Sequence, residues 1–178
     1  MRLLTIFLLI AQVTFAQKFF TRTGQTGFKA SVAAFEPVQA LNKSTSAILN
    51  DKGEIASQLF ISAFKFRVAL MQEHFNENFM DSDTYPKANF KGKIENFDLN
   101  KLSKQAQKVT LSGVLTIRGI AKNIITEGTI SKNGTTIKLI AAFKVTPQDF
   151  EIKIPSVIRR KIARDVTIDI NYDLVEKK

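Results

Sequence analysis

The feature that most constrains this chain is a regular alternation of apolar and polar side chains near its C-terminus. Between Val166 and Leu174 every second residue is apolar, and the residues between them are Thr, Asp and Asn. In an extended strand, this period of two places the apolar side chains on one face and the polar side chains on the other. The stretch therefore predicts a β-strand that buries one face and exposes the other, which is typical of antiparallel sheets.

Similar alternation recurs along the chain and indicates an all-β protein with eight or more antiparallel strands. Two short sequences, Lys132-Asn133-Gly134 and Asp51-Lys52-Gly53, lie between predicted strands and favour tight hairpin turns. Besides Val166–Leu174, we predict strands at Gly27–Phe35, Val38–Leu49, Glu54–Ile61, Phe64–Val68, Ala88–Phe97, Leu111–Arg118, Ile124–Ser131 and Ile137–Val145. Strands of this kind form a barrel or a sandwich, and closure into a barrel leaves no exposed sheet edge.

One segment departs from the period of two. In Ala69–Met80, the residues Met71, Phe75 and Phe79 are spaced four apart, which places them on one face of a helix. A second short helical turn is predicted at Pro155–Arg164, because proline is favoured in the first turn of a helix. We therefore expect one or two short helices beside the strands.

The first sixteen residues have the pattern of a secretory signal peptide. Arg2 supplies a positive start, Leu3–Val13 is mostly apolar, and Thr14 and Ala16 are small residues that suit a cleavage site. The apolar run is about ten residues long, whereas a membrane-spanning helix needs about 20. We expect cleavage after Ala16, which leaves residues 17–178 as a single exported domain in the periplasm or the medium. The alternative is that the run forms a buried strand.

The residue content excludes several kinds of chemistry. The chain has no Cys and one His, which excludes disulfides, thiolate metal sites, cysteine nucleophiles and sites built from several histidines. It also lacks a phosphate-binding loop and a nucleophile elbow. His74 and Glu77 are three residues apart on the predicted helix, but the segment offers too few further ligands for a metal site. We therefore expect no metal, no cofactor and no enzymatic activity.

The chain is basic, with 26 Lys and Arg against 16 Asp and Glu and a net charge of +10. Arg159, Arg160, Lys161 and Arg164 cluster among aliphatic residues. One interpretation is a solvated loop at the end of a barrel, and the other is contact with an anionic membrane surface or a lipid phosphate. A nucleic-acid partner is not expected, because the chain has the pattern of an exported protein and aromatic stacking partners are not concentrated at these cations.

Two ordered motifs resemble those of the YceI-like family, which comprises lipid- and polyisoprenoid-binding barrel proteins. The first begins at Phe64, passes through the predicted helix with its His and aromatic residues, and continues through an acidic turn to Tyr85-Pro86-Lys87-Ala88-Asn89-Phe90. The second is the stretch Leu111–Lys122, which includes Leu115-Thr116-Ile117-Arg118-Gly119. We expect Arg118 and Gly119 to shape a turn, because glycine tolerates a positive φ.

A third and weaker motif, Pro147–Ile152, departs from the family pattern at Gln148 and Glu151. The resemblance covers about residues 18–175, and the long helical form resembles an exported branch of the family. It implies a lipocalin-like, eight-stranded antiparallel β-barrel with an apolar interior that binds a long isoprenoid or a fatty-acid-like lipid. It implies no established catalysis and is compatible with a homodimer.

On this resemblance, we expect the barrel lining to come from strand residues of one parity and from the helix. The expected lining residues are Phe28, Leu59, Ile61, Phe64, Phe66, Phe75, Phe79, Leu115, Ile117, Phe143 and Ile168. The alternative is that the same side chains simply fill the barrel as its core. His74, Asn76 and Asn78 either hold a polar head group at the mouth or fix the helix by hydrogen bonds.

Three functional hypotheses follow in order of preference. The first is an exported lipid-binding protein, the second is a ligand-free structural or stress-related exported barrel, and the third is an enzyme or enzyme accessory that uses His74. A continuous cavity of about 300–1,000 Å³ favours binding, whereas a filled interior favours the second hypothesis. A convergent polar cluster that includes a base inside the barrel favours the third.

Overall fold

The computed structural model describes residues 17–32 and 34–177. The predicted signal peptide, residues 1–16, lies outside the described residues. All strand pairings are antiparallel. The strands are β1 (Lys18–Ser31), β2 (Gln39–Asn50), β3 (Glu54–Phe60), β4 (Lys65–Phe66), β5 (Lys87–Ile94), β6 (Gln107–Ile117), β7 (Ile120–Asn133), β8 (Thr136–Val145) and β9 (Ile162–Glu176).

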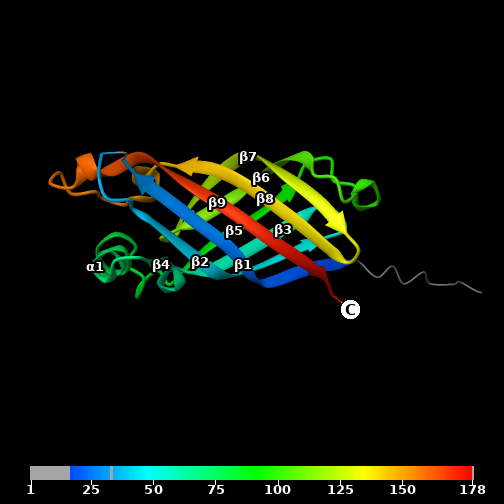
Figure 1. Ribbon diagram of the computed structural model, residues 1–178, viewed down its shortest axis with the longest axis horizontal. Coiled ribbons are helices and arrows are strands. Elements are labelled where there is room, and N and C mark those ends of the chain that lie inside the picture. Colours follow the sequence, from blue (N-terminus) through cyan, green and yellow to red (C-terminus); the bar gives the residue numbers. More distant parts are fainter. Residues whose placement is uncertain (1–16, 33, 178) are drawn as a thin grey trace, which may run out of the picture.

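Eight of these strands form a closed barrel, which is visible in Figure 1. Their order is β1-β9-β8-β7-β6-β5-β3-β2, and the barrel closes where β1 pairs with β2. The two-residue strand β4 pairs with the start of β2 at Ala40 and Leu41. The predicted eight-stranded antiparallel barrel is therefore confirmed, and the sandwich alternative is wrong.

The largest difference from the predicted strands is in β1, which was expected at Gly27–Phe35. The strand begins at Lys18 and ends at Ser31. Its first half is hard to detect because the pairing register with β2 shifts between Thr21 and Gly24, which interrupts the alternation. Two of its inward side chains are also polar, since Thr21 and Thr26 are buried.

The barrel interior is packed differently at its two ends. At the end that holds the β7–β8 turn, the side chains of Phe19, Leu49, Ile137, Leu139 and Leu174 are fully buried and fill the lumen. A second apolar cluster occupies the other end, where the helix and the segment before β9 lie (Figure 1). The functional question therefore concerns this second end.

The predicted helix at Ala69–Met80 is present as α1 (Ala69–His74), followed directly by the π-helical turn η2 (Phe75–Phe79). The N–H of Met80 donates to the carbonyl of Phe75 at 2.9 Å, a five-residue spacing that widens the last turn. No helix in the described part of the chain has the length and hydrophobicity to cross a membrane.

The predicted helical turn at Pro155–Arg164 is wrong for most of its length. Only the 3₁₀ turn η5 (Arg159–Lys161) is helical, and β9 begins at Ile162. Ile162 pairs with Ser31 of β1, so pairing between β1 and β9 makes this residue part of a strand. Three further 3₁₀ turns are η1 (Ile61–Ala63), η3 (Leu99–Lys101) and η4 (Pro147–Phe150).

The packing between β1 and β9 gives a first testable prediction. A methyl group added at Gly24 would lie 2.7 Å from Cδ1 of Tyr172, whereas one added at Gly27 of the same strand would meet nothing closer than 3.7 Å. Gly24→Ala should therefore lower the free energy of unfolding by about 1–3 kcal/mol, the usual cost of overpacking. Gly27→Ala is the matched control and should leave it nearly unchanged. Urea denaturation measures both, and equal stability of the two variants would contradict this packing.

Candidate ligand-binding site

The second end of the barrel contains a partly open apolar cavity of about 350 Å³. Inward-facing residues of the strands form its wall. Two segments outside the strands complete it: α1 with η2 on one side, and the β8–β9 connection, residues 146–161, on the other. The volume lies within the range of about 300–1,000 Å³ that small-molecule sites occupy.

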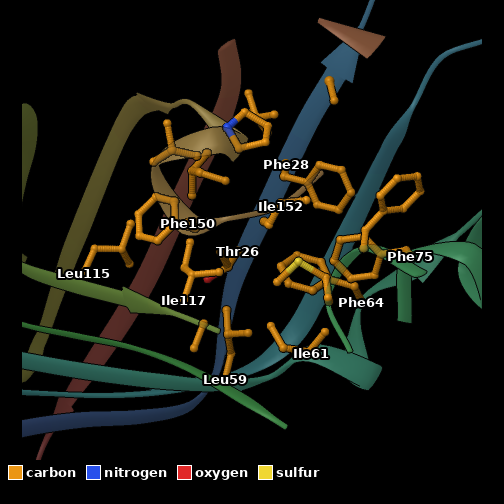
Figure 2. Close-up of a pocket in the computed structure, with 18 of the residues that line it drawn as sticks. Thr26, Phe28, Leu59, Ile61, Phe64, Phe75, Leu115, Ile117, Phe150 and Ile152 are labelled. Carbon is orange, nitrogen blue, oxygen red and sulfur yellow. The ribbon is translucent and has the colours of Figure 1, made fainter. Parts of the chain in front are cut away.

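The structure brings all of the predicted lining residues together on this wall. They are Phe28, Leu59, Ile61, Phe64, Phe66, Phe75, Phe79, Leu115, Ile117, Phe143 and Ile168. In Figure 2, Phe28, Phe64 and Phe75 lie on one side of the hollow, and Leu115 and Ile117 lie on the other. The alternation of inward and outward side chains along each strand accounts for this agreement, because one parity shares one face.

Four phenylalanine rings hold the helix against the barrel. The Phe75 ring stacks on the ring of Phe28 of β1, with centroids 5.1 Å apart and an interplanar angle of 16°. Its centroid also lies 5.6 Å from that of Phe64 and 5.0 Å from that of Phe66. Aromatic pairs of this geometry each contribute about 0.5–1.5 kcal/mol beyond their buried area. The rings that line the cavity therefore also hold the helix against the barrel.

Hydrogen bonds within the helix engage the polar residues that were candidates for head-group contacts. His74 lines the cavity, and its Nδ1 lies 2.8 Å from Nδ2 of Asn78. Asn76 accepts a hydrogen bond from Gln72 at 3.4 Å, and Gln72 in turn accepts one from the backbone N–H of Phe66 at 3.3 Å. Asn76 and Asn78 are not on the cavity wall. These contacts match the alternative in which such residues fix the helix.

The β8–β9 connection was missed as part of the lining. Phe150 is buried, and the wall also includes Pro147, Ile152, Ile154 and Ile158. Their aliphatic side chains recur at short intervals, but the segment has no regular period from which an inward face could be predicted. Figure 2 shows Phe150 and Ile152 among the side chains that line the hollow.

The three sequence motifs meet at this connection. Arg118 lies over the ring of Tyr85, 5.6 Å from its centroid, and donates from Nη1 to the carbonyl of Glu151 at 3.0 Å. Arg118 and Gly119 have positive φ values of 49° and 76°, so they form the tight β6–β7 turn that the sequence predicted. Glu151 also has a positive φ of 54°. The arginine therefore ties the β6–β7 turn to the connection that closes the cavity.

A small polar cluster closes the cavity toward the filled end of the barrel. The hydroxyl of Thr26 lies 3.2 Å from the hydroxyl of Tyr172 and 2.9 Å from that of Thr45. Burial raises the pKa of Tyr172, although its hydrogen bonds with Thr26 and Ser57 oppose this shift. The phenol is therefore neutral at physiological pH. This floor carries no charge, and its polar groups satisfy one another.

The ionisable residues on the wall are few. Among the described residues, the lining holds one imidazole (His74), one amine (Lys161) and one phenol (Tyr172), and no carboxylate. No group of three or more His, Asp or Glu residues in the described part of the chain is arranged to hold a metal ion. The wall is therefore suited mainly to apolar contact.

The rim beside the β8–β9 connection combines positive charge with exposed apolar side chains. Arg159, Arg160, Lys161 and Arg164 take part in none of the ion pairs between described residues. Val157, two residues before this cluster, has 87% of its surface exposed. On the helix at the same end of the barrel, Leu70 is 58% exposed.

The ring cluster leads to a second prediction, on the dynamics of the helix. Phe75→Ala should favour opening of residues 69–80 by about 2 kcal/mol, because several aromatic contacts are lost at once. Amide hydrogen exchange should therefore be about thirtyfold faster in the helix and unchanged in β7 and β8. Leu70→Ala, on the exposed side of the same helix, is the control and should change neither. Equal acceleration throughout the barrel would show that the helix does not open separately.

Comparison with known proteins identifies the family of the chain and proteins that share its fold. The sequence profile of the YceI-like domain matches residues 11–174. A polyisoprenoid-binding domain from Saccharophagus degradans, implicated in plant cell wall breakdown, is similar with a TM-score of 0.79 and 13% identity, over 92% of this chain and all (100%) of that chain. Burkholderia cenocepacia BcnA is similar with a TM-score of 0.69 and 19% identity, over 85% of this chain and 95% of that chain.

A YceI protein from Campylobacter jejuni is also similar, with a TM-score of 0.63 and 18% identity, over 100% of this chain and 99% of that chain. No curated protein sequence matches the chain. At such low identities these likenesses show a shared fold. The profile match is independent of them and covers most of the chain.

Proposed function

The chain belongs to the YceI-like family, and from this premise we propose that it is an exported protein that holds a long-chain isoprenoid or other amphiphilic lipid in its barrel. The observation that carries the proposal is the apolar cavity of about 350 Å³ at one end of the barrel. The relative from Saccharophagus degradans, described as polyisoprenoid-binding, supports a ligand of this class. The signal-like residues 1–16 support export.

The physical basis of binding is the transfer of a hydrocarbon chain out of water. Each buried methylene contributes about 0.8 kcal/mol, and the wall needs no directional contacts to provide this. The hydroxyl of Tyr172 already hydrogen-bonds within the protein. An apolar chain end that reaches this floor therefore does not deprive a polar group of its hydrogen-bond partner. A polar head group belongs at the rim, where water is accessible.

The two alternative functions have less support. A ligand-free structural barrel would be filled by its own side chains, and the open cavity argues against it. An enzyme would need a base with an orienting partner beside a reacting group. His74 hydrogen-bonds to Asn78, and no carboxylate is found among the described residues of the wall. The lining therefore supports binding better than catalysis.

The proposed binding is tested by a charge placed on the wall. Phe143 lines the cavity, so Phe143→Asp should lower the affinity for a long-chain lipid at least tenfold, because the ligand would have to desolvate a carboxylate. Ile140→Asp makes the same charge change on the outer face of β8, where Ile140 is 42% exposed, and should bind normally. Native mass spectrometry after incubation with lipid measures both. Equal lipid loading of the two variants would contradict a ligand inside the barrel.

We also propose that the rim touches an anionic membrane surface, where lipid can enter or leave the barrel. The supporting observation is that Arg159, Arg160, Lys161 and Arg164, which form no ion pair with another described residue, begin two residues after the exposed Val157. An apolar tip flanked by cations suits the interface of a bilayer with negatively charged lipids.

This contact is tested by removing charge at the rim. The double variant Arg159→Ala with Arg160→Ala should weaken binding to anionic vesicles about thirtyfold, since each cation near the surface contributes about 1 kcal/mol. Lys52→Ala with Lys104→Ala removes the same charge at the opposite end of the barrel and is the control. Vesicle co-sedimentation at low salt measures both. Equal weakening by the two double variants would indicate only a non-specific effect of net charge.

A further inference from the structure

The two segments that complete the cavity wall carry opposite charges. The acidic segment, residues 69–85, contains α1 and η2 and has four carboxylates and no Lys or Arg: Glu73, Glu77, Asp81 and Asp83. The basic segment, residues 152–164, has five cations and no carboxylate: Lys153, Arg159, Arg160, Lys161 and Arg164. Surface charges that serve only solubility are usually mixed in sign, whereas a region of one sign creates a directed field.

Both segments border the same cavity. Met71, His74 and Phe79 of the acidic segment line it, and so do Ile154 and Ile158 of the basic segment. Figure 1 shows the two segments at the same end of the barrel, one on each side of it. Since the cavity is partly open at this end, the space between the two segments is part of its mouth.

The charges of both segments are free to act across this mouth. All five cations and three of the four carboxylates are exposed, and Asp81 is partly buried. None of these nine charges takes part in an ion pair between described residues. Opposite charges attract without direct contact, over a distance that falls to about 10 Å at 0.1 M salt. The acidic and basic segments therefore attract each other across the mouth.

The two segments differ in how firmly they are held. Arg118 donates to the carbonyl of Glu151, directly before the basic segment, and Arg159 donates to the carbonyl of Ile154 within it. By contrast, none of residues 69–79 in α1 and η2 is fully buried, and the ring of Phe75 holds this helix by packing alone. The acidic segment is therefore the part whose movement changes the width of the mouth.

From these observations we infer that the mouth is an electrostatic gate that an anionic membrane opens. Away from a membrane, attraction between the segments keeps the mouth narrow. At an anionic surface, the lipids attract the cations of the basic segment and repel the carboxylates of the acidic segment, so the membrane binds the open form better. The inference rests on the proposed lipid-binding function and specifies how access to the cavity is regulated.

The gate is tested by measuring the width of the mouth in delipidated protein. The chain has no Cys, so spin labels attached at Ala69→Cys and Ser156→Cys, both exposed and uncharged positions, report one distance between the segments. Raising NaCl from about 0.01 M to about 1 M shortens the screening length from about 30 Å to about 3 Å and should lengthen this distance by several ångströms. At low salt, phosphatidylglycerol vesicles should lengthen it similarly, and phosphatidylcholine vesicles should leave it unchanged.

Charge variants separate attraction across the mouth from a general effect of salt. Glu73→Lys with Glu77→Lys leaves the acidic segment with two carboxylates and two amines, and so with no net charge. This variant should have the long label distance already at low salt and should not respond to added salt. Glu54→Lys with Glu127→Lys makes the same change on β3 and β7 and should keep both the short distance and its salt dependence.

A second variant guards against a change in the helix itself. Arg160→Gln with Arg164→Gln leaves the acidic segment intact, and it should also lengthen the distance at low salt, because it weakens the attraction from the other side. A short distance in this variant would show that the first variant had only disturbed the helix, and would overturn the gate.

The remaining outcomes separate the gate from the function on which it rests. A label distance that does not change with salt, or equal lengthening in the control variant on β3 and β7, would overturn the gate. Lengthening by salt but not by phosphatidylglycerol vesicles would overturn the membrane as its trigger. The distance measurement needs no ligand in the cavity, so these results leave lipid binding standing. Absence of lipid loading in native mass spectrometry would instead overturn the proposed function.

Discussion

Closure of the sheet between β1 and β2 is the constraint on which the rest of the structure depends. Once the barrel is closed, one parity of every strand must face the lumen, so the choice of inward residues decides whether the interior is filled or hollow. Large aliphatic side chains with Phe19 fill one end. At the other end the inward side chains line the cavity and do not fill it.

Two segments that are not strands cover the hollow end and complete its apolar lining. The rings of Phe28 and Phe75 hold the helix on one side, and Arg118 holds the β8–β9 connection to the β6–β7 turn on the other. The two contacts differ in chemistry. The helix is held by aromatic packing, whereas the connection is held by a hydrogen bond to a backbone carbonyl. The helix, which depends on side-chain packing, is the better candidate for the part that opens.

The sequence predicted the barrel and most of its inner face because period-two alternation is a local property of each strand. Leu115, Ile117 and Phe143 could be placed on the wall for that reason. The first half of β1 escaped detection, because a register shift interrupts its pattern and threonines take inward positions. The roles of Phe150 and Tyr172 were missed because they depend on contacts between distant segments, which no local pattern encodes.

The most direct test of the account is a crystal structure of the protein purified without detergent from a host that makes isoprenoid lipids. The account predicts continuous, elongated electron density that runs between Phe28 and Leu115 and ends at the hydroxyl of Tyr172. A cavity that holds only ordered water, or a lumen filled by rearranged Phe75 and Phe150 side chains, would contradict the claim that this barrel holds an apolar ligand.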